Sequence, residues 1–233
     1  MYPLIILAGG MATRLGDTVK DIPKCLISVA GKPFIDWQLD YVSKQGITDI
    51  YICSGWLGDK VEDYLNAHEY NNLNINIISD GKTLLGTGGA VNNILSILPD
   101  HFFVLYGDTY LPIDFSEIEN YYKNNINPKK NLLTIYENNS KLDTSNIIYQ
   151  NNAIIKYSKK DLDKNMKHID YGLSIMAKTS FNTYNKVGSF DLANLYEYLV
   201  NNKLLSPYLV TERFYEIGTP EALAESEEYF KRL

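Results

Sequence analysis

Short apolar runs alternate with amphipathic stretches through the first half of the chain. The apolar runs are rich in Ile, Leu, Val and Phe and predict buried strands at 4–7, 49–53, 74–78 and 102–106. The intervening stretches carry apolar residues at helical spacing and predict helices at 34–45, 58–65 and 87–98. Strands alternating with helices over short connections are typical of a mostly parallel sheet with helices on both faces.

The second half has a different pattern. Apolar strands joined by polar turns are predicted at 132–136, 146–149, 153–157 and 172–176, followed by helices at 191–201 and 220–231. Pro220 stands at a favoured first-turn position of the last helix. Because no repeat or low-complexity linker divides the chain, the sequence predicts one α/β domain over 1–233. Its sheet is expected to be mixed but mostly parallel.

Composition narrows the class of protein. The 233 residues carry a net charge of −6, which argues against a nucleic-acid binder or a protein held on a membrane surface. No apolar run reaches the length of a membrane span, and the N-terminus lacks the pattern of a signal peptide. The two cysteines, Cys25 and Cys53, have no metal-ligand spacing and build no disulfide scaffold. We therefore expect a cytoplasmic globular protein.

The strand at 4–7 runs directly into a glycine-rich loop with two cations beyond it. Gly9 and Gly10 expose backbone N–H groups that a phosphate can approach without meeting a Cβ. Arg14 and Lys24 then offer a planar fork and a point charge to the same anion. The loop lacks the G-x-G-x-x-G spacing of a dinucleotide-binding turn. A plain strand-to-loop turn explains the glycine pair alone, but not the two cations at this spacing.

These residues carry a resemblance to a known family. The run Ala8-Gly9-Gly10-Met11-Ala12-Thr13-Arg14-Leu15, followed by Pro23-Lys24, resembles the G-x-G-T-R-L…P-K signature of the sugar-1-phosphate nucleotidyltransferases, with departures at Met11 and Ala12. The resemblance implies a single Rossmann-like domain that joins a nucleoside triphosphate to a sugar 1-phosphate and releases pyrophosphate. It also implies a nucleotide-binding half at about 1–110 and a sugar-phosphate-binding half at about 111–233.

The resemblance further implies a Mg²⁺ site beside the phosphates. Asp108 in Gly107-Asp108-Thr109 follows a predicted strand and matches the family's metal-binding aspartate. Glu216 stands where the family's D-I-G-T-P element has its acidic residue, one methylene longer here, and is expected to complete the metal site. With Arg14 and Lys24, Asp108 is also expected to be catalytic, since the reaction depends on positioning and on cancelling charge.

Other matches imply where the nucleotide and the sugar phosphate bind. For the nucleotide, the expected set is Leu7, Ala8, Gly9, Gly10, Asp80, Gly86, Thr87 and Gly107. Gly86 and Thr87 belong to Leu85-Gly86-Thr87-Gly88-Gly89-Ala90, which the family lays over the base, although a glycine-started helix cap explains it too. Asp80 is an acceptor that suits the donor edge of guanine, which favours GTP.

For the sugar phosphate, the matching stretches are those of bacterial mannose or heptose 1-phosphate guanylyltransferases. The expected set is Asp143, Ser145, Asn146, Lys159, Asp170 and Gly172. Lys159 lies in Ser158-Lys159-Lys160, which lacks the glutamate of the family's E-K-P element, and Asp170-Tyr171-Gly172 stands in for N-A-G. A solvated hairpin tip is the alternative explanation of the lysines. Synthesis of a nucleotide sugar for lipopolysaccharide or capsule is the role that this resemblance implies.

Three alternatives stay open at this point. A uridylyltransferase or cytidylyltransferase acting on another phosphorylated acceptor would share the same loop and cations. A glycosyltransferase would be expected to carry D-x-D, whereas the chain has Asp108-Thr109-Tyr110. A catalytically degenerate regulator that binds a nucleotide sugar would tolerate the departures at Met11 and Glu216. A homodimer is also left open.

Overall fold

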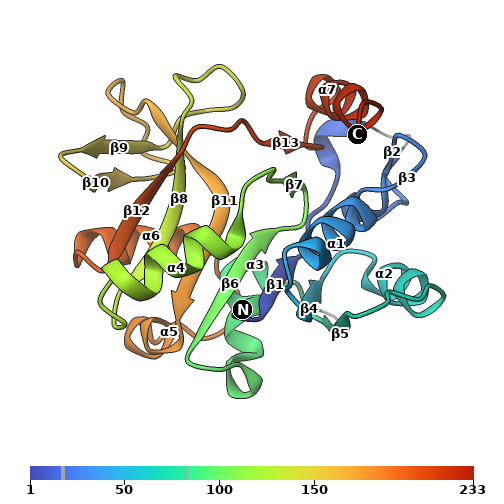
Figure 1. Ribbon diagram of the computed structural model, residues 1–233, viewed down its shortest axis with the longest axis horizontal. Helices are drawn as coiled ribbons and strands as arrows, with labels where there is room; N and C mark the ends of the chain where they lie inside the picture. Colours follow the sequence, from blue (N-terminus) through green and yellow to red (C-terminus); the bar gives the residue numbers. More distant parts are fainter. Residues whose placement is uncertain (17–18, 82) are drawn as a thin grey trace. The chain divides into compact units, whose positions relative to one another are not determined.

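The computed structural model describes residues 1–16, 19–81 and 83–233, which divide into two compact units that do not follow chain order (Figure 1). Unit 1 comprises Met1–Leu84, Leu105–Pro112 and Phe214–Leu233, and unit 2 comprises Leu85–Val104 and Ile113–Arg213. The C-terminal segment therefore belongs with the N-terminal strands. The predicted assignment of ligands to halves at 1–110 and 111–233 stays a prediction.

Unit 1 is built on parallel strands. β1 (Leu4–Leu7) pairs with β4 (Asp49–Ser54), and β4 pairs with β5 (Asn74–Ser79). The end of β6 (His101–Tyr106) lies on the other side of β1. Parallel strands place their carboxyl ends at one edge of the sheet, which is where ligands bind in open α/β sheets. The loops after β1, β5 and β6 therefore start at the same edge.

The helices and short ladders of unit 1 pack around this sheet. The helices are α1 (Phe34–Lys44), α2 (Gly58–Asn66) and α7 (Pro220–Phe230). Two short antiparallel ladders join β2 (Ser28–Val29) to β3 (Lys32–Pro33) and β7 (Thr109–Tyr110) to β13 (Tyr215–Glu216). α1 stops just before Gly46, whose φ of 83° suits the left-handed turn after a helix, as predicted.

Aromatic packing fixes α7 in unit 1. Trp37 of α1 stacks on Phe230 with ring centroids 4.4 Å apart, and Tyr215 of β13 stacks on Tyr229 at 3.8 Å. The predicted N-terminal signal of α7 is correct, since Pro220 occupies its first turn and the Thr219 side chain accepts from the Ala222 N–H. Burial of these rings holds the C-terminal helix against α1 and against the strand that carries Glu216.

Unit 2 is mostly antiparallel. The start of β6 belongs to it, and its other strands are β8 (Asn131–Glu137), β9 (Ile147–Gln150), β10 (Ala153–Tyr157), β11 (His168–Ala177) and β12 (Leu205–Val210). The pairs β9–β10, β8–β11 and β9–β11 are antiparallel, whereas β8–β12 is parallel. The predicted α/β class with a mixed sheet is therefore confirmed, with its parallel strands concentrated in unit 1.

Four helices complete unit 2. They are α3 (Gly86–Asn93), α4 (Phe115–Asn125), α5 (Lys178–Tyr184) and α6 (Leu192–Asn201), with α4 in front of the strands and α6 behind them in Figure 1. The prediction of one helix over 87–98 is wrong at its end, because the chain tightens into a 3-10 turn at Leu95–Ile97. α4, α5 and β12 were not predicted, although Asp114 caps α4 by accepting from two backbone N–H groups.

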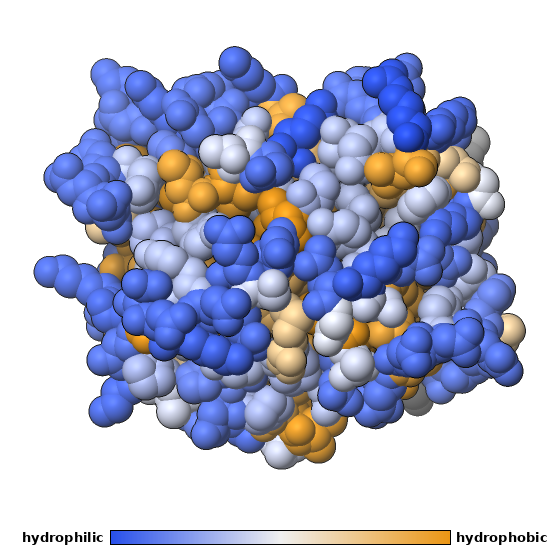
Figure 2. Space-filling model, in the orientation of Figure 1, coloured by the Kyte–Doolittle hydropathy of each residue, from blue (hydrophilic) through white to orange (hydrophobic). Residues whose placement is uncertain are grey.

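The face of the molecule shown in Figure 2 is mainly polar. Figure 2 shows hydrophilic side chains over most of the visible face, with apolar side chains gathered in separate patches. Scattered apolar surface of this kind is ordinary in globular proteins. None of the helices in the described part of the chain combines the length and the apolar character needed to cross a membrane.

Candidate active site

The loop after β1 is held against the end of β4 by close backbone contacts. The Ala8 N–H donates to the Cys53 carbonyl at 2.8 Å. A Cβ added to Gly9 would lie 3.1 Å from the backbone nitrogen of Gly55, a tight contact that favours glycine at position 9. The predicted glycine loop is thus formed. Gly55, which sequence reasoning missed, is its counterpart beyond β4.

The end of β6 meets the same loop. The Gly107 N–H donates to the Leu7 carbonyl at 3.0 Å, and a Cβ on Gly107 would lie 2.7 Å from that oxygen and 3.0 Å from the Ala8 Cα. Leu7 and Ala8 are themselves buried, so their backbone atoms, not their side chains, shape the loop. This close approach brings Asp108, the next residue, to the sheet edge beside the glycine loop.

Lys24 and Asp108 form the central ion pair of this edge. Lys24 Nζ lies 2.6 Å from Asp108 Oδ2, and the Thr109 hydroxyl donates to Asp108 Oδ1 at 3.1 Å. Burial of the carboxylate raises the pKa of Asp108, but the neighbouring Lys24 ammonium and the hydrogen bonds outweigh burial and hold that pKa below its ordinary value. Asp108 is therefore ionised at neutral pH, with 35% of its side chain exposed.

Glu216 is brought to the same place by the β7–β13 ladder. Glu216 pairs with Thr109 in register, and the Ile217 N–H donates to the Asp108 carbonyl at 3.1 Å. The Glu216 carboxylate accepts from the Gly218 N–H at 2.6 Å. Burial, followed by the negative charge of Asp108, raises the pKa of Glu216 above its ordinary value. The two carboxylates thus act on each other, as they would when they share a cation.

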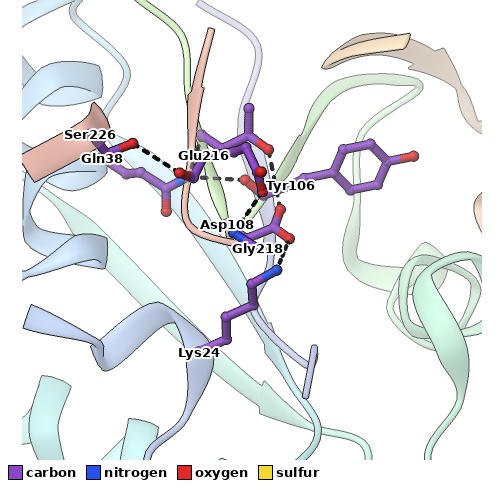
Figure 3. Close-up of polar contacts among 8 residues, drawn as sticks. Lys24, Gln38, Tyr106, Asp108, Glu216, Gly218 and Ser226 are labelled. Atoms are coloured by element: carbon purple, nitrogen blue, oxygen red, sulfur yellow. Dashed lines mark hydrogen bonds and ion pairs between the residues drawn. The ribbon is translucent and has the colours of Figure 1, made fainter. Parts of the chain in front are cut away.

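Gly218 leaves the space in which these charges meet (Figure 3). A Cβ at this position would lie 2.4 Å from Glu216 Oε2, 2.9 Å from Arg14 Nη2 and 3.2 Å from Lys24 Nζ. Arg14, Lys24, Asp108 and Glu216 come from four separate segments and are named the charged site below. The structure therefore brings together the predicted catalytic and metal-binding side chains, whose roles stay predictions.

The charged site suits Mg²⁺ better than a metal that needs a full set of protein ligands. The described residues contain no group of three or more His, Cys, Asp or Glu side chains able to hold a metal. Mg²⁺ is commonly bound through one or two carboxylates, with phosphate oxygens and water completing the octahedron. Asp108 and Glu216 supply such a pair of hard oxygen donors, and the absence of a side chain at Gly218 lets Glu216 lie close to Arg14 and Lys24.

Asp80 lies next to the glycine loop. It follows β5, and its N–H donates to the Ser54 carbonyl at 2.8 Å. Its Oδ2 is 3.2 Å from the position of a Cβ on Gly55, the residue that packs on Gly9. The structure thus brings Asp80 and the loop together within unit 1, while its predicted contact with the base stays a prediction.

The glycines at 86–89 allow close packing within unit 2. A Cβ on Gly88 would lie 2.2 Å from the Phe190 ring, and one on Gly86 would lie 2.7 Å from the Phe190 carbonyl. The Thr87 hydroxyl donates to Asp191 at 3.0 Å and accepts from the Leu192 N–H at 2.8 Å. These contacts join α3 to the start of α6. The predicted nucleotide contacts of Gly86 and Thr87 stay predictions.

Three predicted sugar-phosphate residues, Asn146, Asp170 and Gly172, form a hydrogen-bonded cluster with Tyr157 in unit 2, and Ser145 precedes Asn146 in the chain. Asn146 accepts from the Asp170 N–H at 3.0 Å, and Asp170 accepts from the Tyr157 hydroxyl and the Gly172 N–H, each at 3.0 Å. Ser145 is buried and accepts from the Ser140 N–H at 2.9 Å. These five residues, Ser145, Asn146, Tyr157, Asp170 and Gly172, are named the Asp170 cluster below.

Two further predicted sugar-phosphate residues, Asp143 and Lys159, lie at the edge of the Asp170 cluster. Asp143 is exposed and accepts from the N–H of the next residue, whereas Lys159 is exposed just beyond β10. Gly172 has a φ of 107° at a register shift in β11. The strand β11 begins at His168, earlier than predicted. The contacts of all these residues with a sugar phosphate stay predictions.

Two buried polar side chains behind the charged site escaped sequence reasoning. Gln38 of α1 donates to the carbonyls of Tyr106 and Thr109, and the Ser226 hydroxyl of α7 donates to the Glu216 carbonyl at 2.8 Å (Figure 3). One signal was available in each case, namely a polar residue on the otherwise apolar face of an amphipathic helix.

Comparisons with known proteins agree with the geometry. Residues 4–117 match the MobA-like NTP transferase domain. The chain is 28% identical to the D-glycero-alpha-D-manno-heptose 1-phosphate guanylyltransferase of Campylobacter jejuni, over 93% of this chain and 95% of that protein. It is also 35% identical to the N-acetylmuramate alpha-1-phosphate uridylyltransferase of Neisseria meningitidis, but over only 48% of this chain and 49% of that one.

A solved structure gives the same result for the fold. HddC from Yersinia pseudotuberculosis, complexed with GMP-PN, superposes with a TM-score of 0.82 and 25% identity, over 99% of this chain and all of that one. The resemblance drawn from the loop, the two cations and the Gly-Asp turn is therefore confirmed at the level of the family.

Proposed function

We propose that this chain, a nucleotidyltransferase of the sugar-1-phosphate group, transfers a guanylyl unit from GTP to a manno-configured sugar 1-phosphate. Heptose or mannose 1-phosphate is the acceptor and pyrophosphate is released. The observation that carries the proposal is the charged site, where Arg14, Lys24, Asp108 and Glu216 converge beside a glycine loop. Two cations and two carboxylates that converge on one residue without a side chain suit the joining of two anions in the presence of a cation.

Each group of the site has a separate task in the proposed reaction. The backbone N–H groups near Gly9 and Gly10 bind phosphate oxygens, while Arg14 neutralises the departing pyrophosphate. Lys24 bridges Asp108 and a phosphate oxygen, because an ammonium has three donors and needs only one for the ion pair. Asp108 and Glu216 would hold Mg²⁺, which when bound draws charge from the phosphate oxygens. Most of the rate gain then comes from positioning and charge cancellation.

The choice of GTP rests on two lines of support. The relative that aligns with nearly the whole of this chain is a heptose 1-phosphate guanylyltransferase, and HddC was solved with GMP-PN. Asp80, next to Gly55 and the glycine loop, supplies carboxylate oxygens for the N1–H and N2 amino group of guanine. Uridylyl transfer is the rival, since a uridylyltransferase shares 35% identity over half of this chain.

The sugar and the setting follow from the same relative. A manno-configured 1-phosphate would bind near Asp143, Asp170 and the lysines beyond β10 in unit 2. A cytoplasmic enzyme of this kind would supply an activated sugar for surface glycan synthesis, where nucleoside triphosphates are available as the other substrate.

The test is a grid of four nucleoside triphosphates against a panel of sugar phosphates, read by pyrophosphate release with Mg²⁺ and with EDTA. We expect GTP to be preferred by about tenfold or more, which corresponds to about 1.4 kcal/mol, and activity to vanish with EDTA. A clear preference for UTP or CTP would overturn the guanylyl assignment and the role given to Asp80. Binding of a nucleotide sugar with no pyrophosphate release in any well would instead favour the degenerate regulator.

A further inference from the structure

Gln38 is a buried amide that holds the backbone on both sides of Asp108. It lies on α1 with 1% of its surface exposed. Its Nε2 donates to the Tyr106 carbonyl at 2.9 Å and to the Thr109 carbonyl at 2.8 Å. These two carbonyls flank Gly107 and Asp108, so one side chain spans the turn that carries the carboxylate (Figure 3).

The hydrogen-bond partners of Gln38 fix the orientation of its amide group. Both neighbouring groups are carbonyl oxygens, which only accept, so the NH₂ group must face them. The Gln38 Oε1 atom is then buried, with no hydrogen-bond partner in the described part of the chain. Leaving a buried polar atom unpaired is unfavourable, and most such atoms in proteins have a partner.

An apolar residue would suit this position of α1 better if packing were its only task. The helix buries Phe34, Ile35, Leu39 and Val42 on the face that Gln38 shares. Gln38 is four residues from Phe34 and from Val42, which places all three on one side of the helix. A buried amide that keeps one unpaired oxygen on such a face indicates a need for its two donated hydrogen bonds.

Those two bonds act on both carboxylates of the charged site. Thr109 begins β7 and pairs with Glu216 of β13, and the Asp108 carbonyl accepts from the Ile217 N–H. A shift of the Thr109 carbonyl would therefore move Asp108 directly and Glu216 through the ladder. Displacements of about 1 Å in a positioned group are enough to lower catalytic rates strongly.

We propose that Gln38 is a positioning residue, whose amide holds the 106–109 turn so that Asp108 and Glu216 are spaced to share one divalent cation. This inference rests on the proposed Mg²⁺-dependent function. Gln38 touches neither substrate nor metal. It acts through two main-chain carbonyls, from the side of the turn that faces the core of unit 1.

Gln38→Met tests the proposal, because Met has a similar size and removes both donors. The matched control is Tyr122→Phe, which removes one buried hydroxyl that donates to the Lys130 carbonyl of unit 2 at 2.8 Å. Three quantities are measured on both variants: the Mg²⁺ concentration at half-maximal rate, the KM for the nucleoside triphosphate that wild type uses best, and the affinity for Mn²⁺ with that nucleotide, read by electron paramagnetic resonance.

For Gln38→Met we expect a Mg²⁺ requirement and a Mn²⁺ dissociation constant each raised about fivefold or more, with kcat about tenfold lower and the nucleotide KM nearly unchanged. Amide hydrogen exchange at Gly107 and Ile217 should also be faster, because their N–H bonds anchor the same turn. Tyr122→Phe should lose thermal stability only. Should Gln38→Met not fold, Gln38→Glu at mildly acidic pH keeps one donor and is expected to show an intermediate rise in both metal constants.

A Gln38→Met enzyme with a lower melting temperature but wild-type Mg²⁺ and Mn²⁺ constants would overturn the proposal and leave Gln38 as a core residue. Failure of the proposed function is distinguishable, since wild type would then show no metal-dependent pyrophosphate release with any substrate pair. Unchanged exchange at Gly107 and Ile217 would likewise contradict the assigned hold on the turn.

Discussion

The two units each contain a polar cluster, but the clusters differ in what their charges do. In the Asp170 cluster of unit 2, both carboxylate oxygens of Asp170 accept from donors of the protein itself, the Tyr157 hydroxyl and the Gly172 N–H. In the charged site of unit 1, Asp108 and Glu216 face each other closely enough for Asp108 to help raise the pKa of Glu216. Both oxygens of Asp170 are thus bonded within the protein, whereas the charged site keeps two carboxylates close together beside Lys24 and Arg14.

This difference distinguishes carboxylates that stabilise the fold from carboxylates that are available to a ligand. A buried carboxylate that receives hydrogen bonds from its own backbone stabilises a turn, and its loss costs folding free energy. Like charges held together cost free energy in the empty protein, and such a cost is repaid when a cation or an anion binds. We therefore expect substitutions in the charged site to act mainly on turnover and those in the Asp170 cluster to act mainly on stability.

The largest effect is expected for Asp108→Asn. Loss of the carboxylate removes a proposed metal ligand and the partner of Lys24, so kcat should fall by about a thousandfold or more. Pyrophosphate release measures the rate, and thermal unfolding shows that the variant is folded. Near-normal turnover of a folded Asp108→Asn enzyme would remove the charged site from the chemistry and break the comparison.

Gly218→Ala should give the next largest loss. The added methyl group would lie 2.4 Å from Glu216 Oε2 and 2.9 Å from Arg14 Nη2, so it would occupy the space in which the charges meet. We expect turnover to fall about a hundredfold, or about 2.7 kcal/mol in transition-state free energy. Steady-state kinetics and a melting curve measure the two quantities together.

Gly46→Ala is the matched control for Gly218→Ala. Gly46 has a φ of 83° after α1 and has no heavy atom within 4 Å of an added Cβ. Alanine there should cost about 1 kcal/mol of stability through backbone strain and leave turnover unchanged. If the two variants lose activity equally, the missing side chain at Gly218 has no special role in the charged site.

Asp170→Asn tests the other side of the comparison. The Asn side chain keeps one acceptor oxygen, but its NH₂ group would face a donor, either the Tyr157 hydroxyl or the Gly172 N–H. The free energy of unfolding should therefore fall by about 1–2 kcal/mol. Urea unfolding gives that value, and kcat should stay within about threefold of wild type because the chemistry lies elsewhere. The KM for the sugar phosphate should rise as well, because the proposed acceptor site lies near Asp170. An unchanged KM would leave Asp170 with a role in folding alone.

The smallest effect concerns the pH dependence of stability. Burial and the charge of Asp108 raise the pKa of Glu216 above its ordinary 4.5, so the folded state holds that proton more tightly than the unfolded state does. Ionisation of Glu216 therefore opposes folding: the associated stability is present below pH 4.5 and is lost as pH rises through the raised pKa. Glu216→Gln should remove this loss and melt about 1–2 °C higher than wild type at pH 7.

The same Glu216→Gln enzyme should be less active than wild type, because it lacks a carboxylate for the metal. The test is the melting temperature of both proteins measured from pH 4 to pH 8. The two melting temperatures should converge at the acidic end. A variant that melts below wild type at pH 7 would show that Glu216 stabilises the fold, and the contrast between the two clusters would weaken.

Local sequence signals predicted much of the framework. The strand at Leu4–Leu7 and its glycine loop, the end of α1 before Gly46, and the start of α7 at Pro220 were all predicted correctly, because each depends on neighbouring residues alone. α4, α5 and β12 were missed even though Asp114 is a good N-cap, since their apolar faces are mixed with charged and tyrosine side chains.

Non-local packing accounts for other errors. The prediction of one helix over 87–98 missed that α3 ends at Asn93 and that its first glycines fit against Phe190, a residue about a hundred positions away. β11 begins earlier than predicted, at His168, because its first residues pair with the distant strands β8 and β9 ahead of the register shift. Neither feature has a local signal, because each depends on which distant segment lies alongside.

By itself, the sequence determined the chemistry that is available: a glycine loop after β1, two cations, a Gly-Asp turn and a late acidic residue before Gly218. It also determined the family, since those residues follow one another at characteristic spacing. Only the tertiary structure decided that the C-terminal segment returns to unit 1, that Glu216 pairs with Thr109, and that Gln38 holds the turn between them. The physical reason is that spacing along a chain is local, whereas the charges of this site meet only after the burial of distant apolar segments has brought their backbones together.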